Sequence, residues 1–425
     1  MKVTFLGGAG EYGRSCFLLQ FEKQTILIDA GVMKSGMTTD ETYPMLTEAI
    51  VKKIDAVFIT HAHEDHVAAL PMLAKLGYKG NIYATTETIN QAIQTIEKWT
   101  DFQKQTQQVV PYERHHINDL RFVTITKDSR KTWNPSREID NLDYMFGMSG
   151  HTVGSVWYVF RFQSKHVFFS GDYSYESDLL MIEEPPNLSI DLAILDGAYA
   201  DSTHSQADNL HTIRTTVQKA MQQKTTVIFQ GPLSGKTQDL MKFIGEAFKK
   251  EVAVRLVVDQ ELMNHTNVLM GNTEWLRPES AENMKRVLSD FRVTNVDQWI
   301  EIPDPFIGFC SEEQIITWLN QQHHTPVTVI TTGPKQKEII ALSQKLDSVS
   351  YQQVRYKVHP SLYESKQMIK KLHPQITVFT HGLNKQIKAM RKAIDNVTKI
   401  KLMNTGDTIT VPSFEHNIRK NNQCN

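Results

Sequence analysis

The first 200 residues alternate short apolar segments with short polar turns, a pattern that predicts many strands and few helices. The first three apolar segments lie close together and predict antiparallel neighbours: VTFL, CFLLQF and TILIDAG. Further strands are predicted at AVFIT, NIYAT, RFVTIT, LDYMFGMS, SVWYVFRF, HVFFSGD and LAILDGAY. Helical periodicity interrupts them in DHVAALPMLAKLG, which ends at Gly77, and in the polar residues 90–120.

From about Ser202 the pattern changes to helices that alternate with strands. ADNLHTIRTTVQKAMQQ and KTQDLMKFIGEAFKK predict helices, whereas TTVIFQG and VRLVVD predict strands. The alternation continues to about residue 350 and is typical of an α/β domain with a parallel sheet. Strands are then predicted at VRYKV, ITVFT and KIKLM, with helices near 361–372 and 383–395. The change of pattern indicates two domains.

The composition fits a globular protein, because 40% of the residues are hydrophobic and 22% are charged. The length of 425 residues suits two or three domains. The formal net charge of −1 excludes a uniformly basic surface but leaves room for a local basic groove. Cys16, Cys310 and Cys424 are widely spaced, which favours a reducing compartment. We see neither a signal-peptide pattern nor an apolar run of about 20 residues, and therefore expect a cytoplasmic protein that does not cross a membrane.

Two glycine-rich segments resemble nucleotide-binding motifs. Residues 8–13, GAGEYG, fit the G-x-G-x-x-G pattern, and Asp29 follows at about the distance of a ribose-binding acid. That fingerprint requires a helix next, whereas strands are predicted here, so we do not expect dinucleotide binding. Residues 231–237, GPLSGKT, have three residues between the glycines where a P-loop has four, so we do not expect a P-loop either.

The segment THAHEDH, residues 60–66, carries the strongest chemical signal in the chain. His61 and His63 are two positions apart after a predicted strand, so an extended backbone points both imidazoles the same way. A turn into a helix then brings Asp65 and His66 to a second position. Imidazole nitrogens and carboxylate oxygens at two adjacent positions suit two divalent metals, zinc above all. The alternative is a polar loop that holds three histidines without a metal.

The order of these motifs resembles that of a known fold. H-x-H-x-D-H after a strand is the signature of the metallo-β-lactamase fold. Asp29 in LIDAG, His151 in SGHTVGS and Asp172 in FSGDYS resemble the other motifs of that fold and occur in the expected order. Asp29 corresponds to an acid that orients the ligand loop, His151 to a metal ligand and Asp172 to a bridging carboxylate.

The rest of the chain resembles the β-CASP nucleases, with ribonuclease J and archaeal relatives of the polyadenylation endonuclease as the nearest members. Asp196 in LDGAYAD resembles the acid of the first β-CASP motif, and His359 in KVHPSLYES and His381 in FTHGLN resemble the last two histidine motifs. Some positions depart from the family pattern: Gly197 replaces a serine, and Ser361 stands where an aspartate is frequent. These departures leave the preferred substrate less defined than the hydrolysis.

The resemblance implies an α/β fold in which a metallo-β-lactamase αββα sandwich carries an inserted β-CASP α/β domain. Residues 1–203 would form the first part of the sandwich, 204–352 the inserted domain, and 353–425 the part of the sandwich to which the chain returns. The helical residues 384–401 carry six lysines and arginines, which fits one wall of a groove for a nucleic-acid backbone or a solvated helix face.

The resemblance also implies a cofactor of two Zn²⁺ ions, with Mn²⁺ as a substitute. The ligands of the first ion would all be histidines: His61, His63 and His151. The ligands of the second ion would be a mixed set: Asp65, His66 and His381. Asp172 would bridge both ions, and Asp29 would orient the loop that carries the ligands.

The expected catalytic residues are Asp65, Asp196 and His359. Two metals can clamp a phosphodiester and lower the pKa of a bridging water, so that hydroxide attacks the phosphorus. His359 would protonate the leaving 3′-oxygen, with Asp196 holding its other ring nitrogen.

We therefore predict a zinc-dependent ribonuclease that acts as an endonuclease, a 5′–3′ exonuclease or both. Three alternatives stay open: a DNA nuclease that acts on single strands, a nucleic-acid-processing subunit without catalysis, and a small-molecule hydrolase such as a thioesterase. Complete metal motifs argue against the second, and an inserted domain of roughly 150 residues argues against the third. A homodimer is also left open.

Overall fold

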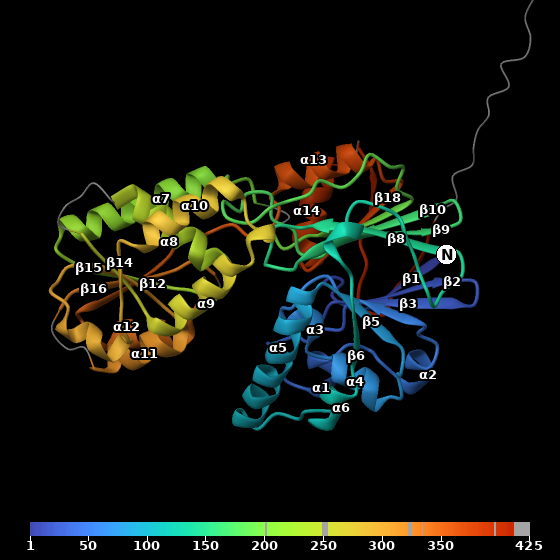
Figure 1. Ribbon diagram of the computed structural model, residues 1–425, viewed down its shortest axis with the longest axis horizontal. Helices are drawn as coiled ribbons and strands as arrows, with labels where there is room; N and C mark the ends of the chain where they lie inside the picture. Colours follow the sequence, from blue (N-terminus) through green and yellow to red (C-terminus); the bar gives the residue numbers. More distant parts are fainter. Residues whose placement is uncertain (200–201, 249–253, 322–324, 334, 395–396, 412–425) are drawn as a thin grey trace, which may run out of the picture.

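The computed structural model describes residues 1–199, 202–248, 254–321, 325–333, 335–394 and 397–411, so Cys424 lies outside the described residues. Three β-sheets dominate these residues: two seven-stranded sheets pack against each other, and a six-stranded sheet lies beside them (Figure 1).

The first sheet is built by the amino-terminal residues and one strand from the carboxyl-terminal region. Its strands, in spatial order, are β20 (Thr408–Thr410), β1 (Lys2–Gly7), β2 (Cys16–Phe21), β3 (Gln24–Ile28), β4 (Ala56–Phe58), β5 (Asn81–Ala84) and β6 (Arg121–Thr124). β1, β2 and β3 are antiparallel neighbours, as the meander pattern predicts, and β3 to β6 are parallel.

The second sheet combines the middle of the first 200 residues with the segment that follows the third sheet. Its strands, in spatial order, are β19 (Lys399–Lys401), β18 (Ile376–Thr380), β11 (Leu192–Asp196), β10 (Lys165–Phe169), β9 (Val156–Phe162), β8 (Leu142–Met148) and β7 (Asn134–Pro135). The register of β11 with β18 places Asp196 opposite Thr380, so the residues that follow β18 lie beside the end of β11.

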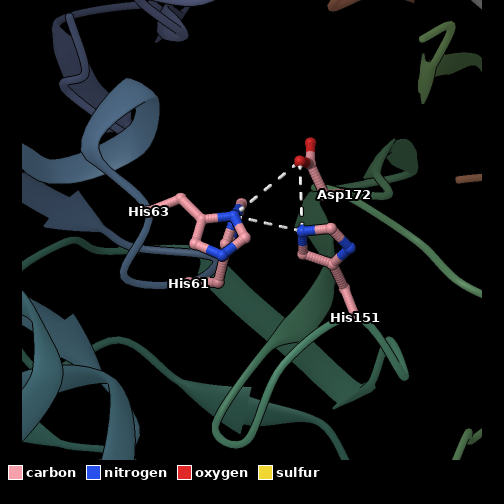
Figure 2. A group of neighbouring side chains, drawn as sticks. All are labelled: His61, His63, His151 and Asp172. Atoms are coloured by element: carbon pink, nitrogen blue, oxygen red, sulfur yellow. Dashed lines mark hydrogen bonds and ion pairs between the residues drawn. The ribbon is translucent and has the colours of Figure 1, made fainter. Parts of the chain in front are cut away.

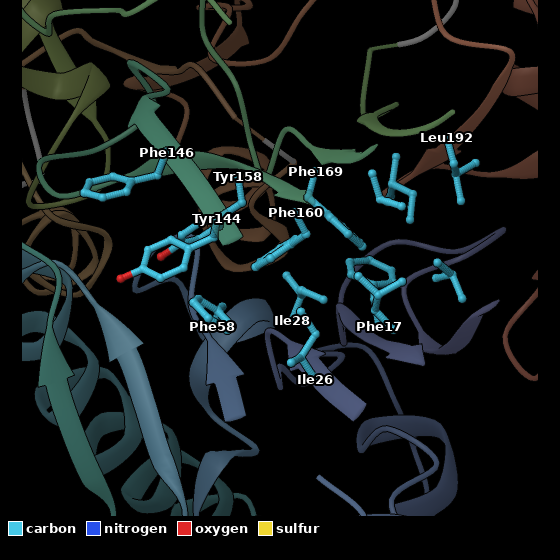
Figure 3. Close-up of a cluster of buried hydrophobic side chains, with 14 of the residues drawn as sticks. Phe17, Ile26, Ile28, Phe58, Tyr144, Phe146, Tyr158, Phe160, Phe169 and Leu192 are labelled. Carbon is cyan, nitrogen blue, oxygen red and sulfur yellow. The ribbon is translucent and has the colours of Figure 1, made fainter. Parts of the chain in front are cut away.

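An aromatic core joins the two sheets (Figure 3). Phe58 of the first sheet lies against Phe160 of the second, with ring centroids 4.9 Å apart and an interplanar angle of 72°. Phe17, Phe169 and other alternate residues of both sheets extend this core, since every second side chain of a strand points to the same face. Burial of these rings fixes the two sheets face to face, and with them the loops at their edges.

Helices cover the outer faces of the sandwich. The first sheet carries short helices and one long one: α1 (Thr39–Thr42), α2 (Glu48–Val51), α3 (Glu64–Val67), α4 (Leu70–Lys75), α5 (Thr86–Gln105) and α6 (His115–Asn118). The second sheet is covered by α13 (Leu362–Leu372) and α14 (Asn384–Ile394). This αββα arrangement confirms the predicted fold class.

The third sheet is entirely parallel, as the alternation of helices and strands predicts. Its strands, in spatial order, are β14 (Phe291–Val293), β13 (Arg255–Val258), β15 (Phe306–Cys310), β12 (Thr226–Gln230), β16 (Val327–Thr331) and β17 (Val349–Gln353). One face packs against α7 (Gln206–Gln222), α8 (Lys236–Phe248), α9 (Gln260–Gly271) and α10 (Pro278–Leu288). The other packs against α11 (Glu312–Gln321) and α12 (Lys337–Lys345), as Figure 1 shows.

Two local predictions are wrong in detail. The helix predicted in DHVAALPMLAKLG is divided into α3 and α4, because Ala69 precedes the new helix with ψ near 0° and Pro71 occupies its first turn. The predicted strand VRYKV is absent, because the backbone N–H and C=O of Lys357 bond the side chain of Gln206 instead of a neighbouring strand.

The glycine-rich residues 8–15 connect β1 directly to the antiparallel β2, with no helix between them. This confirms that a strand follows the segment, where the dinucleotide-binding fingerprint requires a helix. The segment GPLSGKT leads into α8, as predicted. Cys16 and Cys310 are buried free thiols. Among the helices of the described residues, none has the length and hydrophobicity needed to cross a membrane.

Replacing Phe160 by alanine tests the aromatic core. Because Phe160 is fully buried between the sheets, we expect Phe160→Ala to lower the free energy of unfolding by about 3–5 kcal/mol. Urea unfolding followed by circular dichroism measures it. Val109→Ala, at a residue that is 64% exposed, is the matched control and should change stability by less than about 0.5 kcal/mol. An unchanged unfolding midpoint in Phe160→Ala would contradict the assignment.

Candidate metal centre

The predicted site residues come together where several strands of both sheets end. Six of them follow, or end, six different strands: Asp29 after β3, His61 after β4, His151 after β8, Asp172 after β10, Asp196 at the end of β11 and His381 after β18. The strands are rigid and buried, so the loops that leave them hold these side chains in defined positions.

Three histidines and one aspartate form the first group (Figure 2). Nε2 of His151 lies 3.2 Å from Nδ1 of His63 and 3.4 Å from Oδ2 of Asp172, and Nε2 of His61 lies 3.7 Å from the same oxygen. One potential ligand atom from each side chain falls within 4.8 Å of the other three. These are the residues predicted for the first ion, together with the predicted bridge.

The residues predicted for the second ion lie on the other side of Asp172. Oδ1 of Asp172 is 3.3 Å from Nε2 of His66 and 3.2 Å from Nδ1 of His381. Oδ2 of Asp65 is 3.3 Å from Nε2 of His381 and 3.8 Å from Nε2 of His66. The two oxygens of Asp172 thus face the two groups separately.

His359 and Asp196 form a close pair at the same site. Nδ1 of His359 lies 2.7 Å from Oδ2 of Asp196, and the His359 ring is 5.1 Å from the His381 ring. Asp172, Asp196, His359 and His381 form a second set whose potential ligand atoms also lie within 4.8 Å of one another. This second set contains Asp172 and His381 of the predicted residues but neither Asp65 nor His66, because His381 faces Asp172 with Nδ1 and Asp65 with Nε2.

Asp29 is joined to the histidine loop by three hydrogen bonds. Its carboxylate accepts the backbone N–H and the hydroxyl of Thr60, both at 2.8 Å, and Nδ1 of His66 at 2.7 Å. Asp29 has a left-handed backbone (φ 57°), a conformation uncommon outside glycine that is often held at functional sites. With Nδ1 engaged by Asp29, Nε2 of His66 faces the carboxylates of Asp172 and Asp65.

The hydrogen bonds of His61 and His151 direct their Nε2 atoms to the centre of the first group. Nδ1 of His61 donates to the hydroxyl of Thr60 at 3.1 Å, because that hydroxyl already donates to Asp29. Nδ1 of His151 donates to the carbonyl of Val358 at 3.1 Å. Such bonds fix the tautomer in which Nε2 is free to bind a metal.

Burial and neighbouring charges shift the pKa values of several side chains at the site. Burial lowers the pKa of His151 to about 3, against the opposite effect of the nearby Asp172. Burial alone would also lower the pKa of His381, yet the carboxylates of Asp172, Asp196 and Asp65 raise it well above its ordinary value. Burial would raise the pKa of Asp196, but His359 beside it holds that pKa at about 2.

The donor set fits metal ions. Nε2 of His61 and Nδ1 of His381 are buried and have no hydrogen-bond partner in the described structure, although buried ring nitrogens normally have one. Both atoms lie within 4 Å of Asp172. Imidazole nitrogens and carboxylate oxygens are the usual ligands of zinc. The residues present are therefore suited to two divalent ions that share Asp172.

The model of the Metallo-beta-lactamase superfamily matches residues 9–219. The chain therefore contains a metallo-beta-lactamase domain. A crystal structure of a protein of unknown function from Enterococcus faecalis has the same fold, with a TM-score of 0.62 and 12% identity over 96% of this chain and 99% of that one. This agreement extends over the inserted third sheet as well as the sandwich.

The chain is also similar to three proteins that, by their names, process or terminate transcripts. Transcription termination factor FttA of Methanosarcina mazei is 28% identical to it over 65% of this chain. Cleavage and polyadenylation specificity factor 73 of Drosophila melanogaster is 23% identical over 97% of this chain. Endoribonuclease YSH1 of Gibberella zeae is 25% identical over 58% of this chain. The chain covers 44%, 65% and 30% of their respective lengths. The predicted resemblance to the β-CASP family is confirmed.

Three residues of the site were not singled out from the sequence. Thr60 links Asp29 to His61, and its place directly before His61 was the available signal. Ser15 lies 3.4 Å from Nε2 of His66. Gly31 allows the backbone of Asp65 to approach, since a Cβ at this glycine would lie only 1.7 Å from the Asp65 carbonyl oxygen.

The departures from the family pattern have local structural causes. Gly197 approaches β18 so closely that a Cβ would lie 2.9 Å from the carbonyl oxygen of Thr380, and a Cβ at Gly382 would lie 2.6 Å from that of Gly197. Ser361, directly before α13, donates its backbone N–H and its hydroxyl to the carboxylate of Glu364. These contacts set His381 beside Asp196 and start α13 directly after His359.

Replacing Asp29 tests the orienting role. In Asp29→Asn the amide nitrogen replaces an acceptor oxygen, so Thr60 and His66 cannot both keep their bonds. We expect zinc affinity to fall about 10- to 100-fold, measured by elemental analysis after dialysis against buffered zinc, with an unchanged circular dichroism spectrum. Asp143→Asn is the matched control, because Asp143 pairs with Arg161 at the surface. Wild-type zinc content in Asp29→Asn would refute the role.

Proposed function

We propose that the chain is a metal-dependent ribonuclease of the β-CASP family that hydrolyses RNA phosphodiester bonds. The observation that carries the proposal is the close contact of His359 with Asp196 at a site where two metal-suited groups share Asp172; the pair itself belongs to the second of these groups. The named relatives support RNA, because two of them are called an endoribonuclease and a cleavage and polyadenylation specificity factor.

We assign the first ion to three histidines and the second to a mixed set, with Asp172 between them. The first set is His61, His63 and His151. The second set is Asp65, His66 and His381. This choice leaves out His359 and Asp196, because their 2.7 Å contact already engages Nδ1 of His359 and one carboxylate oxygen. His66, by contrast, presents Nε2 to Asp172 while Asp29 holds Nδ1.

When bound, two divalent ions would supply positive charge to a phosphate and lower the pKa of a water between them. The protein itself contributes by holding the side chains of the site in fixed orientations. Asp29 and Thr60 hold the histidine loop, and the carbonyl of Val358 holds His151. Zinc is our proposed metal because of the nitrogen-rich first set, and Mn²⁺ is the proposed substitute.

His359 is the proposed proton donor to the leaving 3′-oxygen. Its Nδ1 is held by Asp196, so the Nε2–H is the proton available to substrate. The side chain is 12% exposed, whereas the side chain of Asp196 is fully buried, so His359 can be reached by a ligand and Asp196 cannot. Asp196 therefore acts through His359 as a positioning residue.

The sandwich and the third sheet are joined close to the metal centre. Gln206, at the start of α7, bonds the backbone of Lys357, and Lys357 is followed by Val358 and His359. We propose the domain division predicted from the sequence, with residues 204–352 inserted between 1–203 and 353–425. A domain inserted here could cover a long strand of RNA, which favours a polymer over a small ester as substrate.

Two further predictions are kept as proposals. We propose a cytoplasmic location, which the buried free thiols of Cys16 and Cys310 support. The exposed Lys385, Lys388 and Lys392 of α14 follow His381 and are proposed as part of the RNA groove. A homodimer stays a prediction.

A cleavage assay on matched RNA and single-stranded DNA tests the proposed function. We expect RNA to be cleaved. Cleavage should stop after chelation of the metal and return when Zn²⁺ or Mn²⁺ is added. Asp172→Asn should lower the rate of cleavage at least 100-fold, because both groups lose their shared carboxylate. Asp143→Asn is the control. Substrates with a 5′-hydroxyl or a 5′-monophosphate separate endonuclease from exonuclease action. Preferential DNA cleavage would move the substrate to DNA, and RNA binding without cleavage would indicate a non-catalytic subunit.

A change of leaving group tests His359. His359→Ala should lower the rate of RNA cleavage by about 10²- to 10⁴-fold, because the leaving alkoxide is no longer protonated. A nucleoside p-nitrophenyl phosphodiester releases a stable phenolate, so its hydrolysis should be nearly unchanged in the variant. His211→Ala, at an exposed histidine of α7, is the control. Equal losses on both substrates would show that His359 is needed for the metal site and not for proton donation.

A further inference from the structure

Tyr12, at the tip of the glycine-rich loop between β1 and β2, is an exposed aromatic residue beside the metal centre. It is 40% exposed, whereas most aromatic residues of the chain are buried. Its ring lies 6.1 Å from that of His381, centroid to centroid, at an interplanar angle of 80°. An aromatic side chain is thus held at the edge of the site, next to a proposed metal ligand.

The loop that carries Tyr12 is fixed by the residue before it. Glu11 accepts hydrogen bonds from the backbone N–H of Gly8, the guanidinium of Arg14 and the hydroxyl of Thr405. Arg14 also bonds the carbonyl of Tyr43. These contacts tie the loop to two distant segments of the chain, so its tip is held in place by several elements at once.

The glycines let this loop lie directly against α14. Gly10 has φ 73°, and a Cβ there would lie 2.7 Å from Nδ2 of Asn384, the first residue of α14. The backbone N–H of His381 donates to the carbonyl of Gly8 at 2.9 Å. The glycine spacing therefore serves a close approach between this loop and the segment that carries His381.

A hydrogen bond at the far end of the side chain sets the orientation of the Tyr12 ring. The hydroxyl donates to Oε1 of Gln386, on α14, at 2.6 Å. With its backbone fixed through Glu11 and its hydroxyl fixed through Gln386, the ring keeps one orientation while a large part of it stays in contact with solvent. Such a ring loses little entropy when a flat ligand stacks on it.

The ring of the other tyrosine at the site is already in contact with neighbouring side chains. Tyr199 lies 5.0 Å from the His359 ring, and the guanidinium of Arg355 lies over its ring at 4.8 Å. Within the part of the chain that the structure describes, Tyr12 has neither a cation over its ring nor a second aromatic partner besides His381. Tyr12 is accordingly the tyrosine at this site with surface free for a ligand.

We propose that Tyr12 is a stacking platform for one nucleobase of the strand whose phosphate lies at the metal centre. The proposal rests on the proposed function and specifies how that site holds its substrate. Stacking on an exposed tyrosine accepts any base, because every base has a π-face. The platform would therefore fix the position of the strand relative to the metals without selecting a sequence.

The test combines removal of the ring with removal of single bases. A series of RNA oligonucleotides is prepared in which a single abasic nucleotide occupies each position around the cleavage site in turn. Their affinities are measured by fluorescence anisotropy with the His359→Ala variant, which cleaves slowly. With Tyr12 present, one abasic position within two nucleotides of the cleavage site should weaken binding about 5- to 100-fold. With Tyr12→Leu, intact RNA should bind as weakly as that abasic RNA, and the abasic penalty should vanish.

Tyr12→Phe separates stacking from the hydrogen bond to Gln386. It keeps the ring and loses the hydroxyl, so it should retain most of the affinity and most of the abasic penalty. A 2-aminopurine at the sensitive position should be quenched by Tyr12 or Phe at this position and not by Leu. Tyr363→Leu is the matched control: Tyr363 is a 68% exposed tyrosine of α13, and the described structure shows no ring stacked on it.

The outcomes distinguish this proposal from the proposed function. If Tyr12→Leu binds and cleaves RNA as the parent does, stacking is overturned and the nuclease stands. If Tyr12→Phe loses as much affinity as Tyr12→Leu, the residue acts through its bond to Gln386 and the platform is also overturned. If the parent protein binds neither RNA nor single-stranded DNA, the platform and the proposed function fail together.

Discussion

The site depends on one buried carboxylate that faces two groups of ligands. Oδ2 of Asp172 points to His61 and His151, and Oδ1 points to His66 and His381. Without a cation, four acidic side chains would share this poorly solvated place with histidines whose pKa values are strongly shifted. Burying charge in this way costs free energy unless the charges are paired. Divalent ions bound at this site would pair with these carboxylates.

The packing of the two sheets makes this arrangement possible. Phe58, Phe160 and their neighbours hold the sheets face to face, and the loops after their strands then meet at one edge. The pairing of β18 with β11 brings a segment from beyond residue 375 beside Asp196, although more than 180 residues separate them. A site assembled this way cannot form before both sheets have paired, so the candidate metal centre depends on the sandwich.

Local sequence patterns were sufficient for most of the elements and for the candidate metal residues that the structure brings together. THAHEDH has a spacing that few structures other than a metal loop require, and the motifs around His151 and Asp172 follow it in order. The split between α3 and α4 and the loss of the strand at VRYKV could not be predicted in the same way. In the second case Gln206, 151 residues away in the chain, supplies the hydrogen bonds that a neighbouring strand would otherwise have given.

The sequence by itself determined the candidate ligands, their order and the resemblance to the family, because residue type and spacing are local properties. Only the tertiary structure decided which atoms face one another: that Thr60 joins Asp29 to His61, that Nδ1 of His359 is held by Asp196, and that two metal-suited groups share Asp172. It also decided the meaning of GAGEYG. The same glycine spacing serves a nucleotide turn or a loop pressed against α14, and only packing distinguishes them, because glycine restricts neither conformation.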